Sequence, residues 1–295
     1  MTGPLFILGA PRSGTSLLYR ALALHPQAAW VNNYNRRLTA LPELAVLNRL
    51  GQRMPDVRRR VWFGEDGDNA YRYGERRSLF ERFFPQPVEG EPLFERRNVV
   101  QDPADPVPDA EQLLLRSDLE RLTRAAGART LVSKRIGHNR RVQMLASIFP
   151  DSKFVVMSRD GRVVARSLLS VDWWPETDIW WWGGGTPGDW AREGGDPLEL
   201  AAKHWVHEVE TIENGLAGIS SRRVLRVSYE ALVRSPIDVL TGTAVFGGLG
   251  VDPDWQEELA RVRFPDKNRI GARTAPDPRV GEIQSGTLRA LGYPA

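Results

Sequence analysis

"FILGAPRSGTSLL", residues 6–18, places a glycine-containing turn between an apolar run and a helical pattern. Residues 4–8, PLFIL, have the length and composition of a fully buried strand. After Gly14, leucines and alanines recur at helical spacing until His25-Pro26 ends the pattern. A strand, a glycine turn and a helix form the opening unit of an α/β fold with a parallel sheet.

The turn itself predicts an anion site. Backbone N–H groups and the positive end of the helix dipole converge at such a turn and bind phosphate groups. Gly9 and Gly14 have the spacing of a Walker A loop, but Thr15 stands where that motif needs lysine. The cation of the loop is Arg12, and its hydroxyls are those of Ser13, Thr15 and Ser16. The loop therefore favours direct contact with an anion over a magnesium-dependent nucleotide site.

A second basic segment lies far along the chain. Arg159 follows the apolar run 153–157, and Ser167 lies in the helical pattern after it. The carboxyl ends of parallel strands meet at one edge of a sheet, so these two side chains are expected to converge on a second phosphate group. The alternative is a local Arg159–Asp160 ion pair at a helix start. Two more apolar runs, 130–133 and 223–227, predict further strands.

Composition limits the class of protein. The chain has 295 residues, of which 41% are hydrophobic, enough for one large domain. No apolar stretch reaches the roughly 18 residues of a membrane span, and without cysteine there is no disulfide framework and no thiolate metal site. These features favour a cytoplasmic protein. The 40 basic residues are balanced by 37 acidic ones, so the arginine doublets are expected on solvated helix faces, and no nucleic-acid partner is expected.

Two stretches interrupt the α/β pattern. Residues 51–118 and 172–197 are expected to form a cap or lid inserted into a single domain, 1–295. The second stretch is rich in tryptophan, and Trp173, Trp174 and Trp181 are its candidate substrate residues. Its aromatic side chains suit a mobile wall for a sugar, an aryl ring or a lipid. They suit equally a loop packed onto the core, or the contact surface of a homodimer.

Three segments together resemble a known family. They are GAPRSGTSLLYRALALHP at 9–26, SKRIGHNRRVQMLASIFPDSKFVVMSRDGRVVARSLLS at 133–170 and VLRVSYEALVRSP at 224–236. These resemble sulfotransferases that use 3′-phosphoadenosine 5′-phosphosulfate (PAPS), in particular their bacterial, tyrosylprotein-sulfotransferase-like branch. The resemblance implies a P-loop NTPase-like three-layer core with a central parallel sheet. It also implies metal-independent transfer of a sulfuryl group to a small-molecule, glycan or glycolipid hydroxyl, with adenosine 3′,5′-bisphosphate as product.

The resemblance also implies roles for individual residues. The residues that would wrap the 5′-phosphosulfate are Arg12, Ser13, Gly14, Thr15 and Ser16. Arg159 and Ser167 would hold the 3′-phosphate, Tyr229 would lie near the adenine, and Lys267 would belong to a closing loop with Asn268 and Arg269. Lys134, at the end of the run 130–133, matches the lysine that contacts the transferring sulfuryl group. The ammonium group of this lysine is suited to neutralise negative charge on the sulfuryl group and on the leaving phosphate.

The chain departs from the family at the catalytic base. Where relatives have a glutamate after the first helix, this chain has Asn32 and Asn33, and an asparagine orients a hydroxyl without taking its proton. Asn33 is therefore a candidate substrate residue, and His138 is the most economical base. The acidic alternatives, which the sequence does not rank, are Glu65, Asp66, Asp68, Glu95 and Asp102. In addition, Val171 stands where the tyrosylprotein branch has a further 3′-phosphate arginine.

Two other functions remain open at this point. A small-molecule or nucleotide kinase would share the α/β core, but it is disfavoured by Thr15 and by the lack of a clear magnesium carboxylate after a strand. A protein that binds anionic glycans or nucleic acid through its arginine clusters is the alternative that involves no catalysis.

Overall fold

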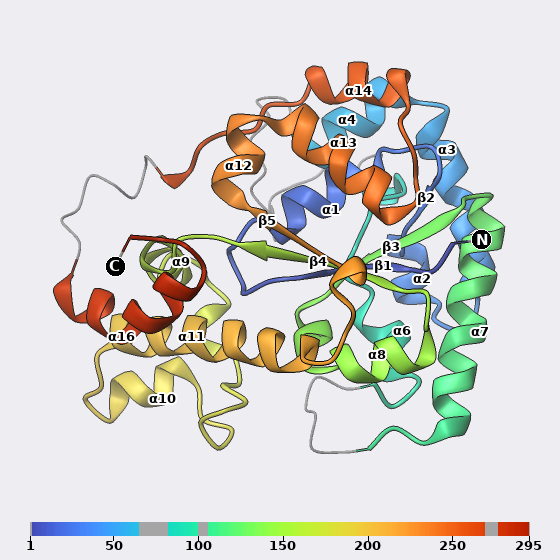
Figure 1. Cartoon of the computed structure of the whole chain (residues 1–295). Coiled ribbons are helices and arrows are strands. Elements are labelled where there is room, and N and C mark those ends of the chain that lie inside the picture. Colours follow the sequence, from blue (N-terminus) through green and yellow to red (C-terminus); the bar gives the residue numbers. More distant parts are fainter. Residues whose placement is uncertain (1, 65–81, 100–105, 269–276, 295) are drawn as a thin grey trace.

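The computed structural model describes residues 2–64, 82–99, 106–268 and 277–294 (Figure 1). At its centre is a five-stranded sheet of order β2-β3-β1-β4-β5, in which every neighbouring pair is parallel. The strands are β1 (Leu5–Leu8), β2 (Ala28–Ala29), β3 (Thr130–Lys134), β4 (Lys153–Ser158) and β5 (Val224–Ser228). The predicted parallel α/β core is confirmed. The two-residue β2 was not predicted, because it is too short to give an apolar run.

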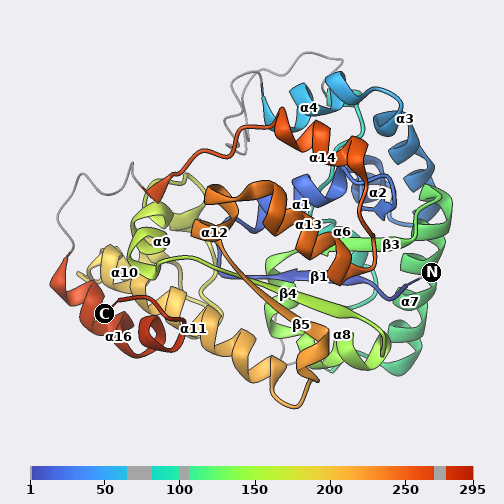
Figure 2. The same cartoon turned by 45° about the horizontal axis from the view of Figure 1, so that its top comes forward.

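Helices cover both faces of the sheet (Figures 1 and 2). One face carries α1 (Thr15–Ala23), α12 (Tyr229–Arg234), α13 (Pro236–Gly247) and α14 (Pro253–Ala260). The other carries α7 (Asp109–Ala126), α8 (Val142–Ile148) and α11 (Pro197–Leu216). Each face has its own buried hydrophobic cluster, and successive residues of β1, such as Phe6 and Ile7, belong to opposite clusters. The three layers follow from this burial of the sheet on both sides.

The remaining elements are short or peripheral. Before the second half of the chain lie α2 (Asn33–Arg37), η1 (Pro42–Leu47), α3 (Asn48–Gln52), α4 (Pro55–Phe63) and α6 (Glu91–Glu95). Later come η2 (Ile136–Arg140), α9 (Gly161–Leu168), η3 (Trp174–Glu176), α10 (Pro187–Arg192), η4 (Ser221–Arg223) and α16 (Pro278–Ala290). The stretch expected as a cap, 51–118, ends within α7, which packs Leu115 of that stretch and the following Leu119 and Leu122 into the core. No helix in the described ranges is long and apolar enough to cross a membrane.

The Trp-rich segment packs against α11 through a buried histidine. His204 of α11 is almost fully buried, lies at the edge of the Trp174 ring and accepts a hydrogen bond from Trp181 Nε1 at 3.2 Å on its Nδ1. Burial lowers the pKa of His204 to about 4, although the nearby Glu208 carboxylate acts in the opposite direction. The imidazole is therefore neutral in the folded protein at neutral pH, which suits its role as an acceptor.

The low pKa of His204 makes the free energy of unfolding fall as the pH is lowered. The pKa of His204 is about 4 in the folded protein and about 6.5 in the unfolded chain. As the pH falls through 6.5, the unfolded chain therefore binds a proton that the folded protein does not bind, and the unfolded state is stabilised. We expect stability to fall between pH 7.5 and 5.5 by about 1 kcal/mol more in the wild-type protein than in His204→Gln. Urea unfolding of both proteins at the two pH values measures the difference. Equal losses in the two proteins would contradict the assignment.

Candidate functional site

The loop between β1 and α1 has the backbone of an anion site. Gly9, Arg12 and Gly14 all have positive φ, of 155°, 68° and 93°, and Gly14 is the N-cap of α1. Arg12 is a non-glycine residue in this region, which is the kind of strain found at ligand sites. The N–H groups of the first helical turn have no acceptor within the helix. Together with the helix dipole they favour an anion in front of the loop.

Side chains from two distant segments meet at this loop. Arg12 Nε donates to Ser167 Oγ at 3.0 Å, and Arg159 Nη1 donates to the Arg12 carbonyl oxygen at 2.9 Å. Arg159 comes from the carboxyl end of β4 and Ser167 from α9, as the sequence predicts. The structure therefore brings the two predicted anion segments into direct contact.

The guanidinium group of Arg159 is buried and that of Arg12 is partly buried, and neither touches an opposite charge in the described part of the chain. Among the described residues, neither has a carboxylate within ion-pair distance. Burial lowers the pKa of both side chains, and for Arg159 the neighbouring Arg12 lowers it further while Glu230 and Asp266 oppose the effect. Unpaired buried cations are costly, and a bound anion compensates them.

Tyr229 and the segment after α14 close one side of the loop. The Arg159 guanidinium lies 4.2 Å from the centre of the Tyr229 ring, and a Cβ on Gly14 would lie 2.6 Å from that ring. Tyr229 Oη donates to the Pro265 carbonyl oxygen at 2.8 Å and accepts from the Lys267 backbone N–H at 3.1 Å. Arg159 Nε also donates to Asn268 Oδ1 at 2.8 Å. The predicted closing residues thus lie beside the predicted 3′-phosphate residues, while Arg269 is outside the described residues.

A buried hydroxyl in the loop is also available. Ser13 is buried, and its Oγ has no hydrogen-bond partner among the described residues. Thr15 is buried too, whereas Ser16 is half-buried at the start of α1. Buried polar atoms are normally hydrogen-bonded, so an orphan hydroxyl at an anion loop is an observation in favour of a ligand. With the two guanidinium groups and the loop amides, the donor set fits a nucleotide that carries phosphate at both ends.

Lys134 lies at the carboxyl end of β3, beside the end of β1. Its ammonium group forms a close ion pair with Glu89, which precedes α6 and keeps about a third of its side-chain surface exposed. His138 lies one turn of η2 further on, with its Nε2 2.9 Å from Ser133 Oγ. The His138 ring is enclosed between Phe6 and Phe94, and burial lowers its pKa well below the ordinary value.

The two asparagines at the family's glutamate position hold the segment that carries Glu89. Asn33 Oδ1 accepts the Gln86 backbone N–H at 3.0 Å, and Asn32 faces Pro87 in an antiparallel bridge. Asn32 Oδ1 itself caps α2, and its Nδ2 donates to Asn48 Oδ1 at 2.8 Å. The Glu89 segment was missed in the sequence, because nothing in VEGEP marks a partner for Lys134. Glu65, Asp66, Asp68 and Asp102 lie outside the described residues, and Glu95 is in α6.

The candidate aromatic residues divide between core and surface. Trp174 is buried against α11, Trp181 stacks on His207 at 4.2 Å between ring centres, and Trp173 is exposed. Packing of this segment on the core is therefore what the described contacts show for Trp174 and Trp181. Nothing in the described ranges places three His, Asp or Glu side chains close enough to hold a metal ion.

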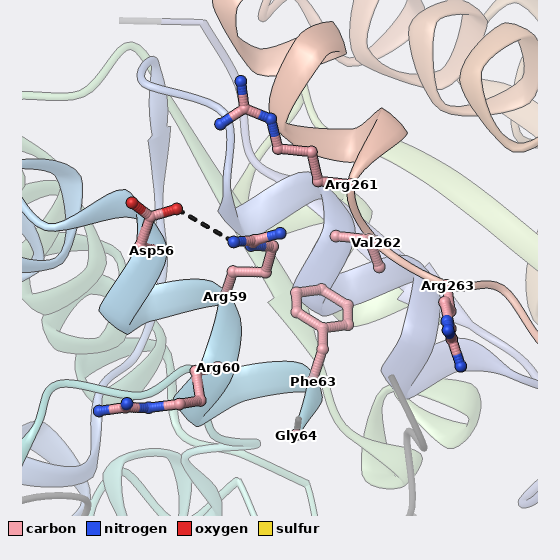
Figure 3. Close-up of a pocket in the computed structure, with 8 residues that line it drawn as sticks. All are labelled: Asp56, Arg59, Arg60, Phe63, Gly64, Arg261, Val262 and Arg263. Carbon is pink, nitrogen blue, oxygen red and sulfur yellow. Dashed lines mark hydrogen bonds and ion pairs between the residues drawn. The ribbon is translucent and has the colours of Figure 1, made fainter. Parts of the chain in front are cut away.

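A cavity of about 360 Å³ lies apart from these residues (Figure 3). Arg59 and Arg60 reach it from α4, and Arg261 and Arg263 from the segment after α14, with Phe63 at its wall. Arg59 is paired with Asp56 at 3.0 Å, and Arg261 with Glu257. None of the residues predicted from the sequence as site residues lines this cavity.

Comparison with known proteins identifies the family. The chain resembles, in structure, the sulfotransferase domain from the curacin biosynthetic pathway, with 17% identity, coverage of 100% of this chain and 99% of that one, and a TM-score of 0.54. Sulfotransferase STF9 from Mycobacterium avium is 14% identical, with coverage of 99% of this chain and 78% of that one and a TM-score of 0.57. The sulfotransferase domain of the Synechococcus PCC 7002 olefin synthase is 19% identical, with coverage of 100% of this chain and 97% of that one and a TM-score of 0.52. At these identities the likeness concerns the fold alone. No curated protein matches the chain. A sequence model described as "Sulfotransferase family" matches residues 4–253, and the chain belongs to that family.

Proposed function

We propose that this protein transfers the sulfuryl group of PAPS to a hydroxyl of a small molecule, glycan or glycolipid. The observation that carries the proposal is a pair of neighbouring guanidinium groups, the buried Arg159 and the partly buried Arg12, that meet no carboxylate among the described residues. Arg12, Ser13, Gly14, Thr15 and Ser16 would hold the 5′ end of the donor. Arg159 and Ser167 would hold the 3′-phosphate, beside Tyr229 and Lys267.

Sulfuryl transfer requires that negative charge on the reacting groups is neutralised and that the acceptor oxygen is correctly oriented. The donor supplies an activated sulfuryl group, whose transfer needs the acceptor oxygen in line with the breaking S–O bond. Lys134 and Arg12 would neutralise charge on the leaving phosphate and on the sulfuryl oxygens. We propose that these cations make a metal ion unnecessary for the transfer, and that the transfer takes place in the cytoplasm. Trp173 and the Trp-rich segment are proposed to line the acceptor side.

The geometry favours Glu89 over His138 as the group that takes the acceptor proton. A general base must reach the hydroxyl, and Glu89 is partly exposed and in contact with Lys134. His138 is enclosed between two aromatic rings, so it is reached only if the core opens. Asn33 contributes by fixing the Glu89 segment through Gln86. On this proposal His138 supports Ser133 and the end of β3 instead.

The donor assignment is tested by calorimetry with adenosine 3′,5′-bisphosphate and AMP. We expect the wild-type protein to prefer the bisphosphate, and Arg159→Ala to lose at least about tenfold in bisphosphate affinity with a smaller change for AMP, because one charge-assisted contact is removed. Arg162→Ala is the matched control, since Arg162 is paired with Asp160 at 2.8 Å. Equal affinity of the wild-type protein for both nucleotides, or no binding, would refute the assignment.

The base is tested with Glu89→Gln and His138→Gln. Each enzyme is assayed for release of adenosine 3′,5′-bisphosphate with a hydroxyl acceptor that the wild type uses, found in a panel of phenols, alkyl alcohols and monosaccharides. We expect Glu89→Gln to lower kcat by about 10²- to 10⁴-fold, and His138→Gln to stay within tenfold of the wild type. Full activity of Glu89→Gln would remove this carboxylate from the mechanism. Loss confined to His138→Gln would return the role to the histidine.

A further inference from the structure

A carboxylate buried in α11 joins three parts of the chain. Glu208 is fully buried, and its Oε2 accepts a hydrogen bond from Asn139 Nδ2 at 2.7 Å. Its Oε1 accepts from Arg140 Nη1 at 3.0 Å and from Trp180 Nε1 at 2.9 Å. The first two donors lie in η2, directly after β3, and the third lies in the Trp-rich segment. None of the reaction steps proposed above uses this network.

Through Asn139 the network reaches the donor loop. Asn139 Oδ1 accepts the Gly9 backbone N–H at 3.1 Å, and its Nδ2 donates to the Gly9 carbonyl oxygen at 3.0 Å. The side-chain amide of Asn139 therefore pairs with both backbone groups of Gly9, as the backbone of a neighbouring strand would. Glu208 determines which way this amide faces. A carboxylate only accepts hydrogen bonds, so it selects the NH₂ end of Asn139 and leaves Oδ1 for the Gly9 N–H.

Trp180 fixes Glu208 from the other side. Its indole N–H occupies Oε1, and its ring lies 5.2 Å from the Arg140 guanidinium carbon, within range of a cation–π contact. Without that N–H, Oε1 would keep Arg140 as its donor, and the carboxylate would have more freedom to turn. A turn of the carboxylate loosens Asn139, and with it both hydrogen bonds to Gly9.

We propose that Trp180, Glu208 and Asn139 form a relay through which the Trp-rich segment sets the geometry of the donor loop. Glu208 and Asn139 are then positioning residues for the donor, and this inference rests on the proposed function of the loop. Because the contacts are contiguous, and Glu208 and Asn139 are buried, an acceptor that presses on the Trp-rich segment is coupled to donor binding, and the coupling is reciprocal. The tryptophans thereby have a role that neither simple packing nor an aromatic wall gives them.

The first experiment compares two tryptophans of the same segment. Trp180→Phe keeps an aromatic ring beside Arg140 but removes the N–H to Glu208. Trp190→Phe is the matched control, because Trp190 Nε1 donates to the Asp196 carbonyl oxygen at 2.9 Å, outside the relay. We expect Trp180→Phe to weaken adenosine 3′,5′-bisphosphate binding by on the order of fivefold, measured by calorimetry, with no change in Trp190→Phe. Equal affinities in the two variants would overturn the relay.

A double-mutant cycle adds a readout that packing alone does not give. Asn139→Leu removes both donors of the amide at similar size and, unlike Asn139→Asp, adds no second carboxylate beside Glu208. The relay predicts that adding Trp180→Phe to Asn139→Leu weakens bisphosphate binding no further. Trp190→Phe in the same background serves as the control. Fully additive losses for Trp180→Phe and Asn139→Leu would mean that they act independently and would overturn the relay.

Hydrogen exchange separates this inference from the proposed function. In the ligand-free protein, the relay predicts faster amide exchange in the peptide that contains Gly9 for Trp180→Phe than for the wild type or Trp190→Phe. Unchanged exchange there would refute the relay whatever the loop binds. Failure of the wild-type protein to bind the bisphosphate would instead refute the donor assignment, and faster exchange in Trp180→Phe would still support the relay.

Discussion

The proposed donor site depends on two cations, Arg12 and Arg159, that the described part of the fold leaves without a carboxylate partner. Two other arginines with buried side chains are matched to carboxylates: Arg135 lies against Glu91, and Arg140 contacts Glu208 at 3.0 Å. Arg12 and Arg159 are instead held by a serine hydroxyl, a carbonyl oxygen and an asparagine. Hydrogen bonds of this kind orient a guanidinium without cancelling its charge. Because an uncompensated charge of this kind is costly, an anion bound beside it would gain binding free energy.

The sequence was sufficient for the elements whose signal is local. An apolar run bounded by proline and glycine predicted β1, and the same reasoning placed β3, β4 and β5 to within a residue or two. Arg159 was found because a polar residue after a buried strand lies at the carboxyl edge of the sheet. Asn139 and Glu208 were not found, since their contact joins residues that are distant in the chain, and neither side chain has a local pattern that marks it.

The proposed base, Glu89, lies at another place in the chain than the glutamate that the family resemblance implies. The implied position holds Asn32 and Asn33, of which Asn32 caps a helix and Asn33 binds the backbone of Gln86. A carboxylate is still supplied, three residues after Gln86, by Glu89. The proton acceptor nearest to Lys134 in the chain is His138, which the sequence therefore predicts as the base. The packed structure puts that imidazole among Phe6 and Phe94, where burial disfavours its charged form.

The loop carries its positive charge at another position than a Walker A loop does. Thr15, which stands in the lysine position, is buried, and its Cγ2 lies 2.7 Å from where a Cβ on Gly9 would be, so position 9 has room for glycine alone. The backbone N–H and carbonyl of Gly9 are both held by Asn139, which fixes this close approach. The cation that the loop does contain is Arg12. Arg12 supplies the charge from a strained left-handed backbone, held on one side by Ser167 and on the other by Arg159.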